Sequence, residues 1–164
     1  MFRCDIQPVA GFFIAAFGAL MSCSDEDDPL KAQDLQTEML RAVNALRANG
    51  CQCGQDFISP VDTLVWSEAL RVAAERRAVD MHHHNYFDHL SADGTSPIMR
   101  AKQAGYDGEY VGENIARYYD NVAGVVQGWQ ESESHCRLMM DTLYNEMGAG
   151  QSGGYWVLNL GRSK

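Results

Sequence analysis

The stretch from residue 146 to residue 161, EMGAGQSGGYWVLNLG, decides the fold class of this chain. It predicts two strands, at about Glu146–Ala149 and Tyr155–Leu160, because short apolar runs flank a cluster of turn-forming residues. That cluster, residues 151–154, has the composition of a hairpin turn. The segment is therefore expected to form an antiparallel pair of strands.

Helical patterns precede this pair. Asn49-Gly50 supplies residues that commonly end a helix, and Ser67 and Asn121 are suited to begin one. Part of residues 111–119 has the pattern of a strand, whereas residues 51–61 are expected to be irregular. Helices followed by a small sheet predict an α+β fold. Apolar spacing or capping signals predict four helices, at about residues 35–46, 68–81, 97–104 and 122–129.

Composition and charge exclude some classes of protein function. The chain has 164 residues, of which 46% are hydrophobic and 21% charged, as in a single globular domain with some additional sequence. Lys and Arg number 13 and Asp and Glu 22, which gives a net charge of −9 and argues against a nucleic-acid partner. Because no apolar run reaches the roughly 20 residues of a spanning helix, a polytopic membrane protein is excluded.

Residues 1–22 are interpreted as a signal peptide, since Arg3 precedes a short apolar run. The run ends at Leu20-Met21-Ser22-Cys23, which resembles the lipobox of bacterial lipoproteins and implies acylation of Cys23. Residues 23–33 then form an acidic tether and residues 34–164 the domain. We therefore expect export and a lipid anchor in the bacterial membrane or cell surface. The alternative is a plain secretory peptide in which Cys23 is incidental.

Three cysteines remain after such processing, namely Cys51, Cys53 and Cys136. An exported chain meets an oxidising compartment, so one pair is expected to close and one thiol to remain. Cys51 and Cys53 are too close in sequence for a relaxed mutual bridge. Either one therefore pairs with Cys136, and spacing alone does not separate the two choices.

Candidate metal ligands come from the histidines. Residues 82–84 are three consecutive histidines, which point about 100° apart on a helix and are better explained as a solvated helix end. His89, Glu113 and His135 offer two imidazoles and a carboxylate, a donor set suited to zinc or another divalent cation. No HExxH or paired CxxC pattern is present, so spacing alone favours three unrelated polar residues.

Several segments together resemble the CAP superfamily (cysteine-rich secretory proteins, antigen 5 and plant pathogenesis-related proteins) in its short bacterial SCP-domain form. The resemblance covers about residues 36–162 and keeps the order of the segments. The segments that carry it are residues 43–47, 64–66, 85–89, 93–97, 112–116, 126–129, 134–137, 145–150 and 155–161.

The resemblance implies an α-β-α sandwich, with helices covering a small, mostly antiparallel sheet and a central cleft. In many animal members two histidines and two glutamates line that cleft, and some members bind zinc there. By motif, His89 and His135 are the two histidines and Glu113 the first glutamate. The second glutamate would fall at Ser132, which Glu131 and Glu133 flank. Glu146, near the last strand, is the candidate for a fourth ligand.

At several single positions this chain differs from, or resembles, the bacterial members of the family. Arg77 stands where many bacterial relatives have His, and Ser134 where they have Gly. The Cys51-Gln52-Cys53-Gly54 loop resembles a subset of bacterial members, and that likeness favours Cys53 over Cys51 as the partner of Cys136.

The family resemblance implies a function without requiring catalysis. We expect a monomeric, non-enzymatic domain whose cleft binds a small ligand, a divalent metal or a protein partner. The alternative is a metal-dependent, peptidase-like hydrolase in which Glu113 acts as base and a metal held by His89 and His135 activates water. No nucleophile is apparent, because Ser134 is next to His135 only in sequence.

Overall fold

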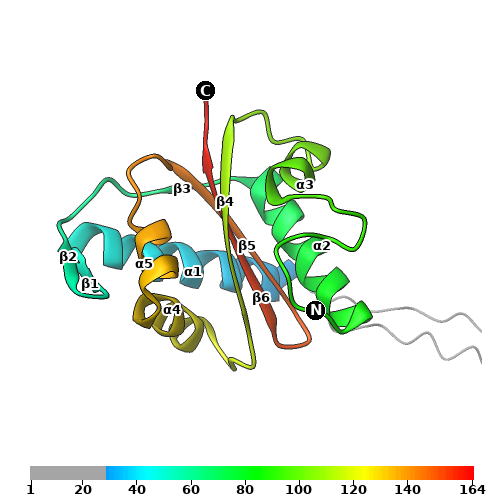
Figure 1. The fold of residues 1–164 in the computed structure, drawn as a ribbon, viewed down its shortest axis with the longest axis horizontal. Coiled ribbons are helices and arrows are strands. Elements are labelled where there is room, and N and C mark those ends of the chain that lie inside the picture. The colour runs from blue at the N-terminus through cyan, green and yellow to red at the C-terminus, as the bar shows by residue number, and fades with distance from the viewer. Residues whose placement is uncertain (1–28) are drawn as a thin grey trace, which may run out of the picture.

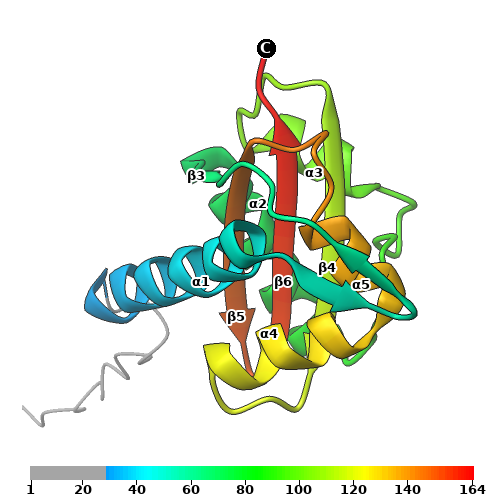
Figure 2. The same cartoon turned by 90° about the vertical axis from the view of Figure 1, so that its left-hand side faces the viewer.

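The computed structural model describes residues 29–164, with side chains from residue 34 onward, so the expected signal peptide and Cys23 lie outside the described residues. Its elements form three layers, with a sheet between two groups of helices (Figure 1). Viewed from the side, α1, α4 and α5 lie in front of the sheet, and α2 and α3 lie behind it (Figure 2). The expected α+β sandwich is confirmed. No helix in this described part is long and apolar enough to span a membrane.

The central sheet has four strands in the order β3-β5-β6-β4. β5 (Glu146–Ser152) and β6 (Tyr155–Arg162) are the expected hairpin. The turn is shorter than expected, because Ser152 already pairs with Tyr155, and Gly153 and Gly154 both have positive φ, as a two-residue type I′ turn requires. β4 (Tyr110–Arg117) pairs antiparallel with β6 and forms one edge, and β3 (Val65–Trp66) pairs parallel with β5 at the other.

The helix α2 (Glu68–His84) packs directly on β5, and α3 (Pro97–Gln103) follows it in the same layer. Glycines make the contact with β5 close: a Cβ at Gly148 would lie 2.1 Å from the backbone nitrogen of Arg71, and one at Gly150 would lie 2.3 Å from that of Glu75. The alanines on the buried face of α2 allow the same close approach.

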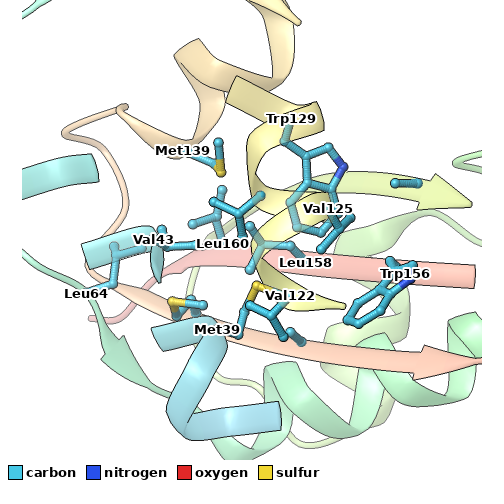
Figure 3. Packing of buried hydrophobic residues seen from close by; sticks show 14 of the residues in the cluster. Met39, Val43, Leu64, Val122, Val125, Trp129, Met139, Trp156, Leu158 and Leu160 are labelled. Carbon is cyan, nitrogen blue, oxygen red and sulfur yellow. The ribbon is translucent and has the colours of Figure 1, made fainter. Parts of the chain in front are cut away.

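The opposite layer holds the main hydrophobic core. α1 (Pro29–Asn49), α4 (Val122–Glu131) and α5 (Glu133–Met139) cover this face, and Trp129 packs there with side chains of β6 such as Leu158 and Leu160 (Figure 3). Asn121 caps α4 as expected, since its side chain accepts a hydrogen bond from the backbone of Gly124. The helix α1 begins inside the stretch that sequence alone assigns to the tether.

A hairpin and a short helix differ from the sequence-based expectation. The segment expected to be irregular contains a hairpin, β1 (Cys51–Cys53) and β2 (Asp56–Ile58), which turns at Gly54 with a positive φ. The helix α5 was not expected as a separate element, because seven residues are too few for a clear apolar period.

Candidate functional site

Two of the predicted site residues meet at the edge strand. Glu113 lies in the middle of β4, where its side chain is 1% exposed, and His89 lies in the loop between α2 and α3 with its side chain 50% exposed. The Nδ1 atom of His89 is 2.9 Å from Oε1 of Glu113. A buried carboxylate therefore meets an imidazole that remains open to solvent.

Arg100 of α3 holds the other oxygen of this carboxylate. Its guanidinium donates to Oε2 of Glu113 at 2.7 Å, and its side chain is only 10% exposed. The same guanidinium donates to the backbone carbonyls of Thr95 and His89. In a neutral imidazole, Nδ1–H of His89 donates a hydrogen bond to the Glu113 carboxylate, and the lone pair is then on Nε2.

The loop that carries His89 is tied to α2 by a second arginine. Arg77 is fully buried and donates to the backbone carbonyls of Asp88 and Leu90, on either side of His89. It also contacts Asp80 and Tyr86. Arg77, which stands where many bacterial relatives have His, thus has a structural role. A histidine could not make all of these hydrogen bonds, because it has fewer donors than a guanidinium.

His135 reaches the same strand from the opposite layer. The fully buried Asn114, next to Glu113 on β4, donates from Nδ2 to the backbone carbonyl of His135 at 3.1 Å. Burial lowers the pKa of His135, and the charge of His89 lowers it further. Adjacent residues of β4 thereby hold both histidines, one through its side chain and the other through its backbone.

The three predicted ligands do not gather as a single metal site among the described residues. Both oxygens of Glu113 are engaged, one by the imidazole of His89 and one by the guanidinium of Arg100. Glu113 therefore orients the imidazole of His89. Within residues 34–164, His89, Glu113 and His135 do not bring one ligand atom each within 4.8 Å of one another. The structure links His135 to His89 electrostatically, because burial and then the charge of His89 lower the pKa of His135.

The candidates for a fourth ligand lie in other surroundings. Glu146 is beside Tyr106, and burial together with this carboxylate raises the pKa of that tyrosine. Glu131 accepts a hydrogen bond from Gln127, and Glu133 pairs with Arg137. None of these three carboxylates has a hydrogen bond to either site histidine in the part of the chain that the structure describes.

An open pocket of about 330 Å³ adjoins the site. It is lined in part by Arg77 and Arg100, the two arginines that position His89, and by Ser91, whose hydroxyl contacts both of them. A ligand in this pocket would therefore lie against the side chains that set the orientation of His89.

Sequence reasoning missed Arg100 and Asn114, and it noted Arg77 only as a departure. A carboxylate within an apolar strand, such as Glu113, needs a charged or hydrogen-bonding partner. The sequence therefore indicates that a basic residue lies beside it. Which of the 13 basic residues it is follows only from the fold.

The cysteines form a separate buried cluster, to which α5 contributes Cys136. Cys53 and Cys136 are joined by a disulfide, with their Cα atoms 5.4 Å apart, and Cys51 is a buried free thiol. This is the pairing that the family resemblance favours. It attaches the β1–β2 hairpin to the helix that carries His135.

Comparison with known proteins agrees with this architecture. Residues 40–159 match the profile of the cysteine-rich secretory protein family, CAP. The chain belongs to the CAP family. Among solved structures, an SCP-domain extracellular protein from Bacillus anthracis aligns with a TM-score of 0.66 and 21% identity, over 83% of this chain and 44% of that one. An outer surface protein from Borrelia burgdorferi aligns with a TM-score of 0.63 and 18% identity, over 83% of this chain and 95% of its own.

Curated relatives of this CAP domain come from Bacillus subtilis. The uncharacterized membrane protein YlbC is 31% identical over 97 residues, which are 59% of this chain and 28% of the relative. The uncharacterized protein YkwD is 34% identical over 92 residues, which are 55% of this chain and 36% of the relative. The chain thus matches about a third of the length of these relatives.

Proposed function

We propose that this CAP domain is an exported, non-enzymatic binding module that uses the imidazoles of His89 and His135 to bind a divalent transition-metal cation or a ligand carrying one. The contact between Glu113 and Nδ1 of His89, at 2.9 Å, carries the proposal. A carboxylate on the far nitrogen of an imidazole fixes its tautomer and raises its basicity as a ligand, an arrangement common behind metal-binding histidines.

The protein surface supplies only part of a coordination sphere. Zinc sites with a catalytic or exchangeable role use three protein ligands and one open position, whereas this site offers two imidazoles. Binding is therefore weaker than at a structural site, and the remaining positions belong to water or to groups of a partner. A module of this kind senses or recruits its ligand without holding a permanent ion.

A zinc titration by calorimetry tests the proposal. We expect the wild-type protein to bind Zn²⁺, and His89→Ala and His135→Ala to lose that binding. The exposed His83 on α2 gives the matched control, since His83→Ala removes an imidazole elsewhere. Glu113→Gln keeps both ligands and is expected to weaken binding by about 10–100-fold.

Two results would contradict the proposal. One is a wild-type protein that takes up no Zn²⁺ near neutral pH. The other is a loss of binding in His83→Ala with none in His89→Ala. Either result would leave the contacts around Glu113 as a purely structural network.

The hydrolase alternative has less support. Ser91 contacts the guanidinium groups of Arg77 and Arg100, and no hydrogen bond joins it to an imidazole among the described residues. The serine that does contact an imidazole there is Ser152, which is buried in the turn region beside His82. A nucleophile must meet both its base and the substrate, and Ser152 is shielded from substrate.

Export and a lipid anchor at Cys23 belong to the same proposal. The apolar run before Cys23 and the acidic residues after it support the anchor, and the membrane, extracellular and surface proteins among the relatives support export. Mass spectrometry of the processed protein tests it. We expect an N-terminal, acylated Cys23, and an N-terminus elsewhere or an unmodified Cys23 would refute the anchor.

A further inference from the structure

Three sulfur atoms meet in a buried cluster that the proposed histidine site does not use. The Sγ atom of Cys51 lies 3.5 Å from that of Cys136 and 3.8 Å from that of Cys53. All three residues are at most 5% exposed. Among the described residues this is the group of three or more His, Cys, Asp or Glu side chains whose ligand atoms gather within 4.8 Å.

The two distances from Cys51 match those of thiolates on one metal ion. With metal–sulfur bonds of about 2.3 Å, the sulfurs of a tetrahedral zinc site lie roughly 3.8 Å apart. Two edges of such a triangle are therefore already present. The third edge, between Cys53 and Cys136, is closed by the disulfide in this structure.

Residues around the cluster favour a soft cation. The thioether of Met140, which is 2% exposed, belongs to the same buried cluster. Thiolate and thioether ligands select thiophilic ions such as Cu⁺ and Zn²⁺ over hard cations. Leu46, Ile58 and Val61 pack against the same cluster, so its surroundings are apolar.

We propose that the reduced Cys51–Cys53–Cys136 cluster is a binding site for one thiophilic d¹⁰ metal ion, and that the disulfide closes this site. A dithiol reductant transfers two electrons and two protons to the Cys53–Cys136 disulfide and is itself oxidised to a disulfide. The three thiols then release their protons when the metal binds. A structural disulfide needs only Cys53 and Cys136, whereas the metal site uses Cys51 as a third ligand.

The test compares the reduced and oxidised forms of the purified protein under anaerobic conditions. Cd²⁺ and Cu⁺ are titrated in separate experiments, and thiolate-to-metal charge-transfer absorption is recorded in the ultraviolet. We expect one ion per chain and a strong band for the reduced wild type, and neither for the oxidised form. Alkylation followed by mass spectrometry should find the three cluster thiols protected by metal in the reduced protein.

Cys51→Ser is the decisive variant because it keeps the disulfide pair. Its oxidised form should melt at the wild-type temperature, and its reduced form should lose both the band and the stoichiometric binding. His89→Ala should leave the band unchanged, which separates this site from the histidine site. No band in the reduced wild type, or equal binding by reduced Cys51→Ser, would overturn the proposal.

Discussion

Two guanidinium groups determine where His89 lies. Arg100 binds the carboxylate of Glu113 and the carbonyl of His89 itself, whereas Arg77 binds the carbonyls of the residues on either side. An imidazole on a loop is thus held from three directions, while half of its surface stays open. Precise placement of an exposed side chain requires buried partners of this kind.

Arg77→Lys is expected to destabilise the protein by at least about 2 kcal/mol, because an ammonium cannot reproduce the forked set of charged hydrogen bonds. The neighbouring Arg76 is exposed, so Arg76→Lys should change the free energy of unfolding by less than about 0.5 kcal/mol. Urea unfolding of both variants measures the difference. Equal stabilities would show that the buried contacts of Arg77 contribute little.

His135 makes stability depend on pH. Burial and the charge of His89 lower its pKa in the folded protein, so the unfolded chain binds a proton more readily. The stability is fully present above about pH 6.5 and is lost as the pH falls through the lowered pKa. His135→Gln should therefore lose less stability than the wild type between about pH 7.5 and about pH 5.5. Urea unfolding at both pH values, with His83→Gln as control, measures this; an unchanged pH dependence in His135→Gln would contradict it.

At the scale of single elements, the sequence predicted the longer helices and strands but not all of the shortest ones. The apolar period of α1 and the capping asparagine of α4 predicted those helices, and the glycine-rich turn predicted the β5–β6 hairpin. The β1–β2 hairpin and α5 are too short for a period. Three site residues came from the family motif, but their partners Arg100 and Asn114 depend on contacts between distant segments.

The close contact of α2 with β5 depends on glycines, which have no side chain to separate the helix from the strand. A Cβ at Gly148 would overlap the backbone of Arg71, so Gly148→Ala should push α2 from the sheet and cost about 1–3 kcal/mol. Gly124 is the control, because a Cβ there meets nothing closer than 3.4 Å and alanine favours a helix by up to about 1 kcal/mol. Thermal melting of both variants should give shifts of opposite sign. A Gly148→Ala protein that melts with the wild type would disprove the close contact.

At the scale of the whole molecule, one covalent bond joins segments that are far apart in the chain. The Cys53–Cys136 disulfide spans 83 residues and links the β1–β2 hairpin to α5. The chain-entropy model gives about 4.5 kcal/mol for a loop of that length. The double variant Cys53→Ser/Cys136→Ser should lose stability of that order in chemical unfolding.

Cys53→Ser alone tests the alternative pairing. The sulfurs of Cys51 and Cys136 are 3.5 Å apart, so this variant should form a Cys51–Cys136 bridge and keep part of the stability. Non-reducing peptide mapping identifies the bridge. In the wild type the same mapping should yield the Cys53–Cys136 peptide, and a Cys51–Cys136 peptide there would refute the pairing.

The position of Glu113 on an edge strand also affects aggregation. An unpaired strand edge is a template for pairing with another chain, and natural sheets suppress this with charges that point inward. β4 carries such a charge at its centre, and the guanidinium of Arg100 and the imidazole of His89 in its own chain pair with that charge. The contacts that orient the site therefore also make β4 a poor seed for intermolecular β-sheet, and neutral substitutions at Glu113 remove both properties together.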